Sequence, residues 1–368
     1  MIDNKLLKNE ERAVFALRSL YKQYGYLPFK MSKFEEYDLY VRNKDFLVSD
    51  RVITFNDTNG RLLALKPDVT LSIIKNTIDE PLCKQKVYYN ENVYRVSGST
   101  HQFKEIMQTG LECIGDIDIH DIFEVVYLSA KSLDAVSADF ALDVSHLGIP
   151  SAILDEASDD KAFKDSLIRL IAEKNSHEAQ ALCEKYGIEK RVADTLVSLT
   201  KMYGEMSDVL KRLEDVCVSE RSRAAYNQLK TLCALLKNTD VSDKIRLDFS
   251  VVNDMNYYNG IVFKGFLNGI PESVLSGGEY GTLMHRMGRK SDAIGFAIYL
   301  DLLEGLNTAG TEYDVDVLLV YDENTDPVRV IEMKNELIAA NKSVCAQKSV
   351  PSKLRYKEKI DLTKEGNK

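Results

Sequence analysis

The sequence predicts an α+β fold: an antiparallel sheet with flanking helices, interrupted by a helical insertion and followed by a short α/β unit. Strand-like segments cluster before residue 150 and again after residue 244, whereas residues 151–243 are charged, poor in Gly and Pro and patterned with helical spacing. Strands clustered in this way favour an antiparallel core over a parallel Rossmann sheet. A chain of 368 residues is long enough for more than one domain. We therefore expect a core over residues 1–310 and a truncated α/β segment over residues 311–368.

The first half of the core is expected to alternate strands with single helices. Apolar side chains at helical spacing predict a helix over residues 6–24, with Gly25 as its stop. The dipeptide Asn59-Gly60 is a strong hairpin signal and predicts two strands within residues 52–65. The remaining elements are strands over 86–96 and 105–115 joined by a polar loop, a helix over 120–133 with Asp121 near its start, and a strand over 139–149.

The strand pattern resumes after the insertion, over residues 245–252 and 260–266. We expect a Gly-Gly turn at 277–278 and a closing helix over 293–306. From residue 313 the pattern predicts strand, helix and short strand, and then a charged end. The basic cluster of this end is interpreted as a solvated tail and not as a tRNA site. It comprises Lys353, Arg355, Lys357 and Lys359.

Composition and charge argue against several classes of function. A net charge of −9 disfavours a broad phosphate-binding face. The histidines stand apart and no two cysteines have the C-x-x-C spacing, so we expect no metal site. The N-terminus has no signal-peptide core, and no apolar run approaches the ~20 residues of a membrane span. Scattered thiols without a secretory signal are typical of the cytoplasm. They are Cys83, Cys113, Cys183, Cys217, Cys233 and Cys345.

Four segments of the core together carry a resemblance to a known family. They are LKPDVT (65–70), VYRVSGSTHQFKEIMQTGLECIG (93–115), NDMNYYNGIVF (253–263), and LSGGEYGTL (275–283) followed by AIGFAIYLDLL (293–303). In this order and at these separations they resemble the catalytic core of class II histidyl-tRNA synthetases, over roughly residues 5–306. The resemblance implies the class II synthetase sheet with its flanking helices.

The resemblance also implies a pocket for an amino acid. In the family, acceptors from the first two segments hold the ammonium group of the amino acid. The matching residues here are Asp68, Thr70, Gln108 and Glu112. These residue types suit the task, because a buried ammonium group needs acceptors and at least one anion. The pair Tyr257 and Tyr258 resembles the family's tyrosines on the imidazole side. The alternative is that the carboxylates are ordinary members of the sheet and the tyrosines ordinary core residues.

The cations that amino-acid activation requires are largely missing. Attack of a carboxylate on the α-phosphorus of ATP needs positive groups that stabilise the developing charge. Of the family's three arginines, the first matches Arg95, whereas the other two positions fall at Asn253 and Leu302. The family's acid, aspartate and basic residue at three further positions are replaced by Ser97, Asn256 and Glu279. We therefore expect no catalytic residue and no cofactor. Arg95 is either a remnant of the ligand pocket or a structural ion-pair partner.

Synthetase-like chains without a complete anticodon-binding domain resemble the regulatory subunits of ATP phosphoribosyltransferase. The resemblance implies a non-catalytic subunit that activates the short-form catalytic subunit in the first step of histidine biosynthesis and helps to make it sensitive to histidine. It also implies a homodimer through about residues 25–45, within a hetero-oligomer that binds no tRNA and no membrane. Two alternatives stay open: a degenerate histidyl-tRNA synthetase, and a free-standing histidine-sensing pseudo-synthetase.

Overall fold

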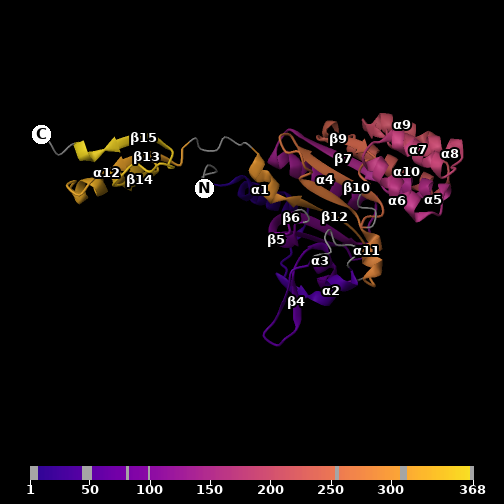
Figure 1. Cartoon of the computed structure of the whole chain (residues 1–368), viewed down its shortest axis with the longest axis horizontal. Helices are drawn as coiled ribbons and strands as arrows, with labels where there is room; N and C mark the ends of the chain where they lie inside the picture. Colours follow the sequence, from indigo (N-terminus) through magenta and orange to yellow (C-terminus); the bar gives the residue numbers. More distant parts are fainter. Residues whose placement is uncertain are drawn as a thin grey trace. The chain divides into compact units, whose positions relative to one another are not determined.

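A computed structural model describes residues 7–43, 52–79, 83–97, 100–252, 257–306 and 313–364. The chain divides into two compact units, residues 1–306 and 307–368. The first unit contains a nine-stranded sheet, in the order β1-β5-β6-β12-β11-β10-β7-β9-β8 (Figure 1). Its strands are β1 (Leu27–Pro28), β5 (Gln85–Val96), β6 (Phe103–Gly115), β7 (Phe140–His146), β8 (Tyr203–Gly204), β9 (Ile245–Asp248), β10 (Ile261–Leu267), β11 (Leu275–Glu279) and β12 (Asp292–Tyr299).

The antiparallel character that the sequence predicts is confirmed. Neighbouring strands are antiparallel except in the pairs β1–β5 and β7–β9, which are parallel. The expected strand pair over 86–96 and 105–115 is β5 with β6, paired from Gln85 opposite Ile114 to Val96 opposite Phe103. This long pair lies next to β1, near one edge of the sheet, and carries one wall of the site described below.

One face of the sheet is covered by α1 (Asn9–Gln23) and α4 (Ile119–Val136), which belong to the same apolar cluster as the sheet residues Leu111 and Phe296. The first helix ends as expected, because Gly25 adopts a φ of +80° that favours glycine. The second helix begins at a capping box in which the Asp118 carboxylate accepts from the N–H groups of His120 and Asp121. Both helices expected from apolar spacing are therefore present.

The opposite face is covered by smaller elements. They are a three-stranded sheet of β2 (Phe34–Glu36), β4 (Leu62–Leu65) and β3 (Thr54–Asn56), with the helices α2 (Tyr37–Arg42), α3 (Thr70–Asn76) and α11 (Gly281–Arg286). The predicted hairpin at Asn59-Gly60 is confirmed as β3 and β4. Its turn is fixed by the Asp57 carboxylate, which accepts from the N–H groups of Asn59 and Arg61 at 2.8 Å each.

The helical insertion follows β7 and returns the chain to β9. Its helices are α5 (Gly148–Ala157), α6 (Lys161–Ala172), α7 (Ser176–Lys185), α8 (Lys190–Leu199), α9 (Met206–Val216) and α10 (Glu220–Leu236), followed by the 3-10 turn η2 (Ser242–Lys244). They gather in one group beside the β7 side of the sheet (Figure 1). The insertion also contains the short strand β8, which the sequence pattern did not indicate; it pairs with β9 at the sheet edge.

Two expectations near the end of the first unit are wrong. Residues 293–306 are not one helix: they form β12 and then the 3-10 helix η3 (Leu300–Gly305). An apolar run buried on both faces has no period that separates strand from helix. Gly277 and Gly278 do not form a turn, because both lie inside β11. A Cβ atom on Gly277 would come within 2.5 Å of the carbonyl oxygen of Gly295, so glycine permits the close packing of the strands.

The second unit is a small parallel sheet. Its elements are β13 (Val315–Val320), α12 (Pro327–Ala339), β14 (Val344–Gln347), β15 (Tyr356–Asp361) and the 3-10 turn η4 (Leu362–Lys364), in the strand order β14-β13-β15. The basic side chains at this end are exposed to solvent, as expected, but they do not belong to an unstructured tail. Lys357 and Lys359 lie in β15, which pairs in parallel with β13, and Arg355 forms a 2.8 Å ion pair with Asp314. Exposed lysines on an edge strand oppose further strand pairing. No helix in the part of the chain that the structure describes is long and apolar enough to cross a membrane.

Candidate ligand-binding site

The expected pocket residues converge on the face of the main sheet that α3 and the small sheet cover. Asp68 lies just before α3 and Thr70 is its first residue, while Glu112 lies in β6. All three are buried, with 9%, 8% and 2% of their surface exposed. Gln108 is also buried, four places from Glu112 along the same strand and hence on the same face. Residues distant in the sequence thus form one polar cluster inside the protein.

Glu112 is the centre of this cluster. The Thr70 hydroxyl donates to its Oε1 at 3.3 Å, and the Tyr280 hydroxyl donates to its Oε2 at 2.7 Å. Burial, and then the nearby Asp68 carboxylate, raise the pKa of Glu112 to about 8, against the opposing effect of the two hydrogen bonds. The carboxyl group is therefore mostly protonated in the empty site at neutral pH. A cation bound beside it would favour the ionised form.

Asp68 adds a second buried carboxyl group. Its Oδ1 accepts from the N–H group of Leu71 at 2.9 Å, which caps the first turn of α3. Burial raises the pKa of Asp68, while that hydrogen bond and the charges of Arg95 and Lys66 act in the opposite direction. The Arg95 guanidinium group is held at the end of β5, where its Nε donates to the carbonyl oxygen of Pro67 at 3.0 Å. Arg95 therefore contributes positive charge near Asp68 and also fixes the backbone before α3.

The strand opposite Glu112 makes room for its side chain. Gly295 in β12 pairs with Glu112, and a Cβ atom built on Gly295 would collide with the Glu112 carboxylate. Any other residue at this position would have to displace the carboxyl group. The absence of a side chain at Gly295 therefore leaves the space that the buried Glu112 side chain occupies.

Tyrosines form the remaining wall. The rings of Tyr257 and Tyr258 lie 4.7 Å apart edge-to-face, and the Tyr257 ring lies 6.2 Å from the ring of Tyr280. Tyr257 also shares a hydrogen bond with Thr70, which joins it to the Glu112 cluster. The hydroxyl of buried Tyr89 lies against the same cluster, where burial and the charges of Glu112 and Asp68 raise its pKa. These acceptors and rings suit an ammonium group attached to a planar or aromatic side chain.

Sequence reasoning missed Tyr280 and Tyr89. Tyr280 follows directly after the Gly277-Gly278-Glu279 run, so its proximity to the glycines was a usable signal once these were recognised as part of a strand. Tyr89 has no such signal, because it is one of two adjacent tyrosines in a long strand and only the pairing register shows which one faces the pocket.

The positions where the family's arginines would stand carry no positive charge other than Arg95 in the part of the chain that the structure describes. Asn253 and Asn256 lie outside the described residues. Leu302 lies in η3 and packs against the main apolar cluster. Ser97 follows β5, and its hydroxyl accepts from the N–H group of Thr100 at 3.3 Å. Among these positions Arg95 is thus the retained cation.

Glu279 and Arg289 have structural partners. The Glu279 Oε2 accepts from the N–H group of Ile261 at 2.6 Å, and burial raises the pKa of Glu279. Glu279 is therefore a partly buried acceptor for the backbone and not a charge directed at a phosphate. Arg289 follows α11 in the sequence, and its guanidinium group donates to the carbonyl oxygen of Ile74 at 2.8 Å, near the end of α3. This bond directs it away from the role of a phosphate ligand.

A potential metal group within the described residues consists of Asp118, His120 and Asp121. The Lys84 ammonium group already occupies it, since it binds Asp118 at 2.9 Å and Asp121 at 2.5 Å. The two carboxylates also cap α4. The geometry therefore suits a lysine and a helix end rather than a metal ion.

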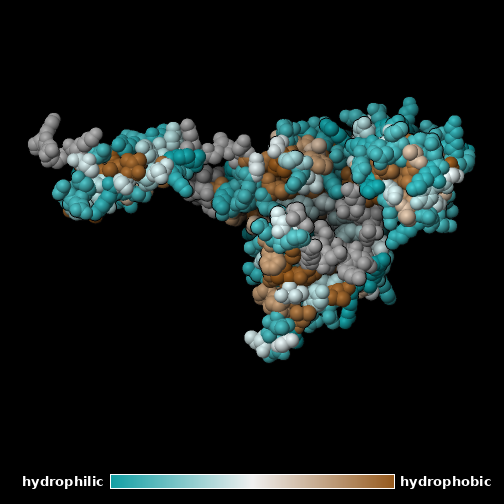
Figure 2. All heavy atoms as spheres, viewed as in Figure 1, coloured by the Kyte–Doolittle hydropathy of each residue, from teal (hydrophilic) through white to brown (hydrophobic). Residues whose placement is uncertain are grey.

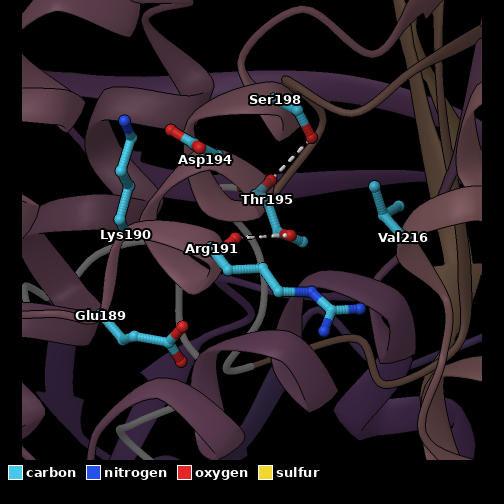
Figure 3. A pocket seen from close by; sticks show the side chains of 7 residues that line it. All are labelled: Glu189, Lys190, Arg191, Asp194, Thr195, Ser198 and Val216. Carbon is cyan, nitrogen blue, oxygen red and sulfur yellow. Dashed lines mark hydrogen bonds between the residues drawn. The ribbon is translucent and has the colours of Figure 1, made fainter.

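The helical insertion has an open depression on α8, shown in Figure 3. In that view the ammonium group of Lys190 and the guanidinium group of Arg191 point in different directions. The hydroxyls of Thr195 and Ser198 donate to carbonyl groups of their own helix, of Arg191 and Thr195 respectively. These groups do not converge on one ligand, and the depression is not a candidate for the site.

Comparisons with known proteins match these observations. The chain matches the family model described as histidyl-tRNA synthetase over residues 3–303. A protein of Oceanobacillus iheyensis named ATP phosphoribosyltransferase regulatory subunit is 28% identical over 337 residues, which are 90% of this chain and 82% of that protein. A protein of the same name from Clostridium kluyveri is 28% identical over 318 residues, 83% of this chain and 81% of that protein.

Solved structures show the same fold. One, described as an ATP phosphoribosyltransferase regulatory subunit/histidyl-tRNA synthetase from Bacillus halodurans, superimposes with a TM-score of 0.77 and 22% identity over 98% of this chain and 97% of that chain. A chain of the ATP phosphoribosyl transferase complex from Thermotoga maritima has a TM-score of 0.63 and 20% identity, over 79% of this chain and 97% of that chain.

Proposed function

The chain belongs to the histidyl-tRNA synthetase family, and from this premise we propose that it is the non-catalytic regulatory subunit of ATP phosphoribosyltransferase. Relatives that carry this name align with most of the chain, and they include the two described above. One observation carries the proposal: the acceptors for an ammonium group are retained around Glu112, whereas the partly buried Leu302 packs against the core where a phosphate-facing arginine would stand.

The loss of cations bears on the rate of adenylation. Removing one preorganised contact to a charged transition state lowers a rate by about a hundredfold or more, on the order of 3 kcal/mol. Leu302 offers no charge and Arg289 is bound to α3, so neither supplies a substitute for that contact. A chain that binds an amino acid without activating it suits a regulatory subunit.

The partner proposed for this chain is the short-form catalytic subunit of ATP phosphoribosyltransferase. The test is to copurify the two chains and to measure phosphoribosyl transfer with and without this chain. We expect the two chains to form a complex and the rate of phosphoribosyl transfer to rise. If no complex forms and the rate is unchanged, the assignment is refuted. Histidine-dependent exchange of pyrophosphate into ATP should be absent; measurable exchange would instead support a degenerate synthetase.

Histidine is the ligand proposed for the Glu112 pocket. Its ammonium group would lie against Asp68, Thr70 and Glu112, and the tyrosines would contact its ring. Calorimetric titration of this chain with histidine tests the assignment. Binding that Glu112→Ala abolishes is expected, whereas equal binding by the variant would place the ligand elsewhere. A free-standing sensor would bind histidine in the same way but would leave phosphoribosyl transfer unaffected.

The small sheet supports the proposal of a homodimer. Cross-strand partners share a face, so Phe34 with Leu65 and Phe55 with Leu63 form one apolar surface. The Phe34 and Phe55 side chains are 50% and 36% exposed, with their rings 5.4 Å apart. Brown surface gathers in this part of the molecule, near β4, in Figure 2. An exposed apolar surface of this kind marks an interaction site, and Phe34 lies within the segment expected to form the dimer.

Sedimentation velocity of Phe55→Glu tests the dimer. The change places a charge in the apolar surface, so a shift from dimer to monomer is expected. Leu62→Glu is the matched control, because Leu62 is also exposed but belongs to the opposite face of the same sheet. A dimer that persists in Phe55→Glu would move the interface elsewhere. We further propose that the assembly is cytoplasmic and binds no tRNA, consistent with six free thiols and the net charge of −9.

A further inference from the structure

The residues that follow the pocket tyrosines are held by two backbone hydrogen bonds, one to β11 and one from Leu147. The N–H group of Asn259 donates to the carbonyl oxygen of Glu279 at 2.9 Å, and that of Leu147 donates to the carbonyl oxygen of Gly260 at 2.9 Å. The N–H group of Ile261 uses the Glu279 side chain instead, at 2.6 Å. The Glu279 carboxyl group therefore holds the first residue of β10, three residues after Tyr258.

Gly260 shows how closely that carboxyl group approaches. A Cβ atom on Gly260 would collide with the Glu279 Oε2. The carboxyl group is thus seated directly against the backbone that follows the tyrosines.

A chain of side chains links Glu279 to the helical insertion. Gln228, on α10, hydrogen bonds to Glu279, and its Oε1 also lies 2.7 Å from the Nε2 of His146. The Nδ1 of His146 accepts from the N–H group of Gly148 at 3.0 Å, so its Nε2 carries the proton and donates to the Gln228 Oε1. The amide group of Gln228 is then left to donate to the Glu279 carboxyl group. The hydrogen bonds of His146, Gln228 and Glu279 are thus compatible with one consistent set of donors and acceptors.

We propose that Gln228 is a positioning residue that couples the docking of α10 to the placement of the pocket tyrosines, through His146 on one side and Glu279 on the other. The relay begins where the insertion leaves the sheet, because His146 ends β7 and Gly148 begins α5. A partner or ligand that shifts α10 therefore changes the bond that holds Glu279. Binding of a partner to the helical insertion would then change ligand binding in the pocket. The affinity measurement used to test this rests on the function proposed above.

In coupling of this kind, binding at one site changes the binding free energy at the other, and the effect is the same in both directions. A ligand that orders the Tyr257–Tyr258 segment should also stabilise α10, and a partner bound to the insertion should change ligand affinity. The mechanism needs no large movement, because the Glu279 carboxyl group contacts both Gln228 and the N–H group of Ile261.

The experiment compares Gln228→Leu with Asn227→Ala in the full chain. The leucine side chain retains most of the volume but cannot bridge His146 and Glu279. Asn227 is the adjacent residue on α10 with an exposed side chain, and it is the matched control. Residue-resolved hydrogen exchange without ligand should show faster exchange of the Ile261 amide in Gln228→Leu, by about fivefold or more. The amide of Phe263, within the β10 ladder, should remain unchanged in both variants.

Calorimetric titration with histidine supplies the second measurement. Gln228→Leu should weaken binding by about five- to tenfold, as the loss of one ordering hydrogen bond predicts, while Asn227→Ala should not. The same protection of Ile261 in both variants would overturn the relay, whatever the affinities. If the Gln228→Leu change disturbs the packing of α10, as unfolding temperature would reveal, Gln228→Ala replaces it. If histidine fails to bind even the unchanged chain, the ligand assignment fails, and the exchange of Ile261 alone decides the relay.

Discussion

Replacement of Glu112 by glutamine isolates the energetic effect of burying an ionisable group in the pocket. In the empty site the carboxyl group is held between the hydroxyls of Thr70 and Tyr280, and burial raises its pKa to about 8. Glutamine has nearly the same shape. Its carbonyl oxygen can accept from Tyr280, and its amino group can donate to the Thr70 hydroxyl. The variant therefore mimics the protonated acid at every pH.

The sign and size of the effect follow from linkage. Because the pKa of Glu112 is higher in the folded state, the folded protein binds this proton more tightly than the unfolded chain. Its stability must then fall as pH rises from the unfolded pKa towards about 8. A rise in pKa from 4.5 to about 8 corresponds to at most about 5 kcal/mol. The negative charge of Asp68 contributes part of this rise, after burial.

The assay is urea unfolding of the unchanged chain and of Glu112→Gln at several pH values from about 5 to 8, followed by circular dichroism and tyrosine fluorescence. The difference between their free energies of unfolding cancels the contributions of the titrating groups that the substitution does not affect. Glu112→Gln should gain stability relative to the unchanged chain by up to about 1.4 kcal/mol per pH unit over this range. A difference that is independent of pH would show that Glu112 does not titrate near 8 and would refute the account of the pocket.

Three further predictions concern the same region. Histidine affinity should increase as pH rises from about 6 towards 8, by up to about tenfold per pH unit, because the ligand's ammonium group favours the ionised form of Glu112. Calorimetry in buffers of different ionisation enthalpy should detect the proton that Glu112 releases on binding. An affinity that does not depend on pH would contradict this prediction. Gly295→Ala should weaken histidine binding and destabilise the protein by about 1–3 kcal/mol, since its methyl group would displace the Glu112 carboxylate; unchanged binding would show that the carboxylate can move. Glu91→Leu should destabilise the protein by about 3–5 kcal/mol, because it leaves the fully buried Lys66 ammonium group without the partner it contacts at 3.0 Å. In urea unfolding, the double variant with Lys66→Met should recover much of that loss. Purely additive effects of the two substitutions would show that Lys66 and Glu91 do not interact.

Elements with a clear local signal could be predicted from the sequence. The capped helix α4, the hairpin at Asn59-Gly60 and the long pair of β5 and β6 each follow from turn chemistry or periodicity over short spans. The position of Gln108 and Glu112 on the same face of their strand also follows from strand geometry alone. These features are determined within one or two elements, so neighbouring residues are sufficient to specify them.

The errors arose where distant parts of the chain decide the structure. Residues 293–299 form a central strand because β6 and β11 pair with both of its edges, and apolar composition alone did not distinguish that from a helix. Likewise, Tyr356–Asp361 carries three charged side chains in a row and is a strand only because β13 offers it a parallel partner. Tyr280 belongs to the pocket because the register of β11 and β12 brings it to Glu112. None of these pairings has a signal in the adjacent sequence.

The pocket and the relay together suggest how a synthetase scaffold can serve as a regulator. In the proposed cycle the empty pocket is close to neutral, because burial raises the pKa of Glu112 and keeps it protonated. An ammonium ligand brings its own charge, favours ionisation of Glu112 and orders the tyrosines that contact it. The ordered tyrosine segment is attached through Ile261 to Glu279, and through Gln228 to the helical insertion. Binding free energy can thus bias the position of α10, which is the differential interaction that any ligand-driven switch requires. In a synthetase the same free energy would have to position a carboxylate for attack on ATP. In the function proposed here that use is lost, because position 302 is a leucine, while the pocket still senses the ligand.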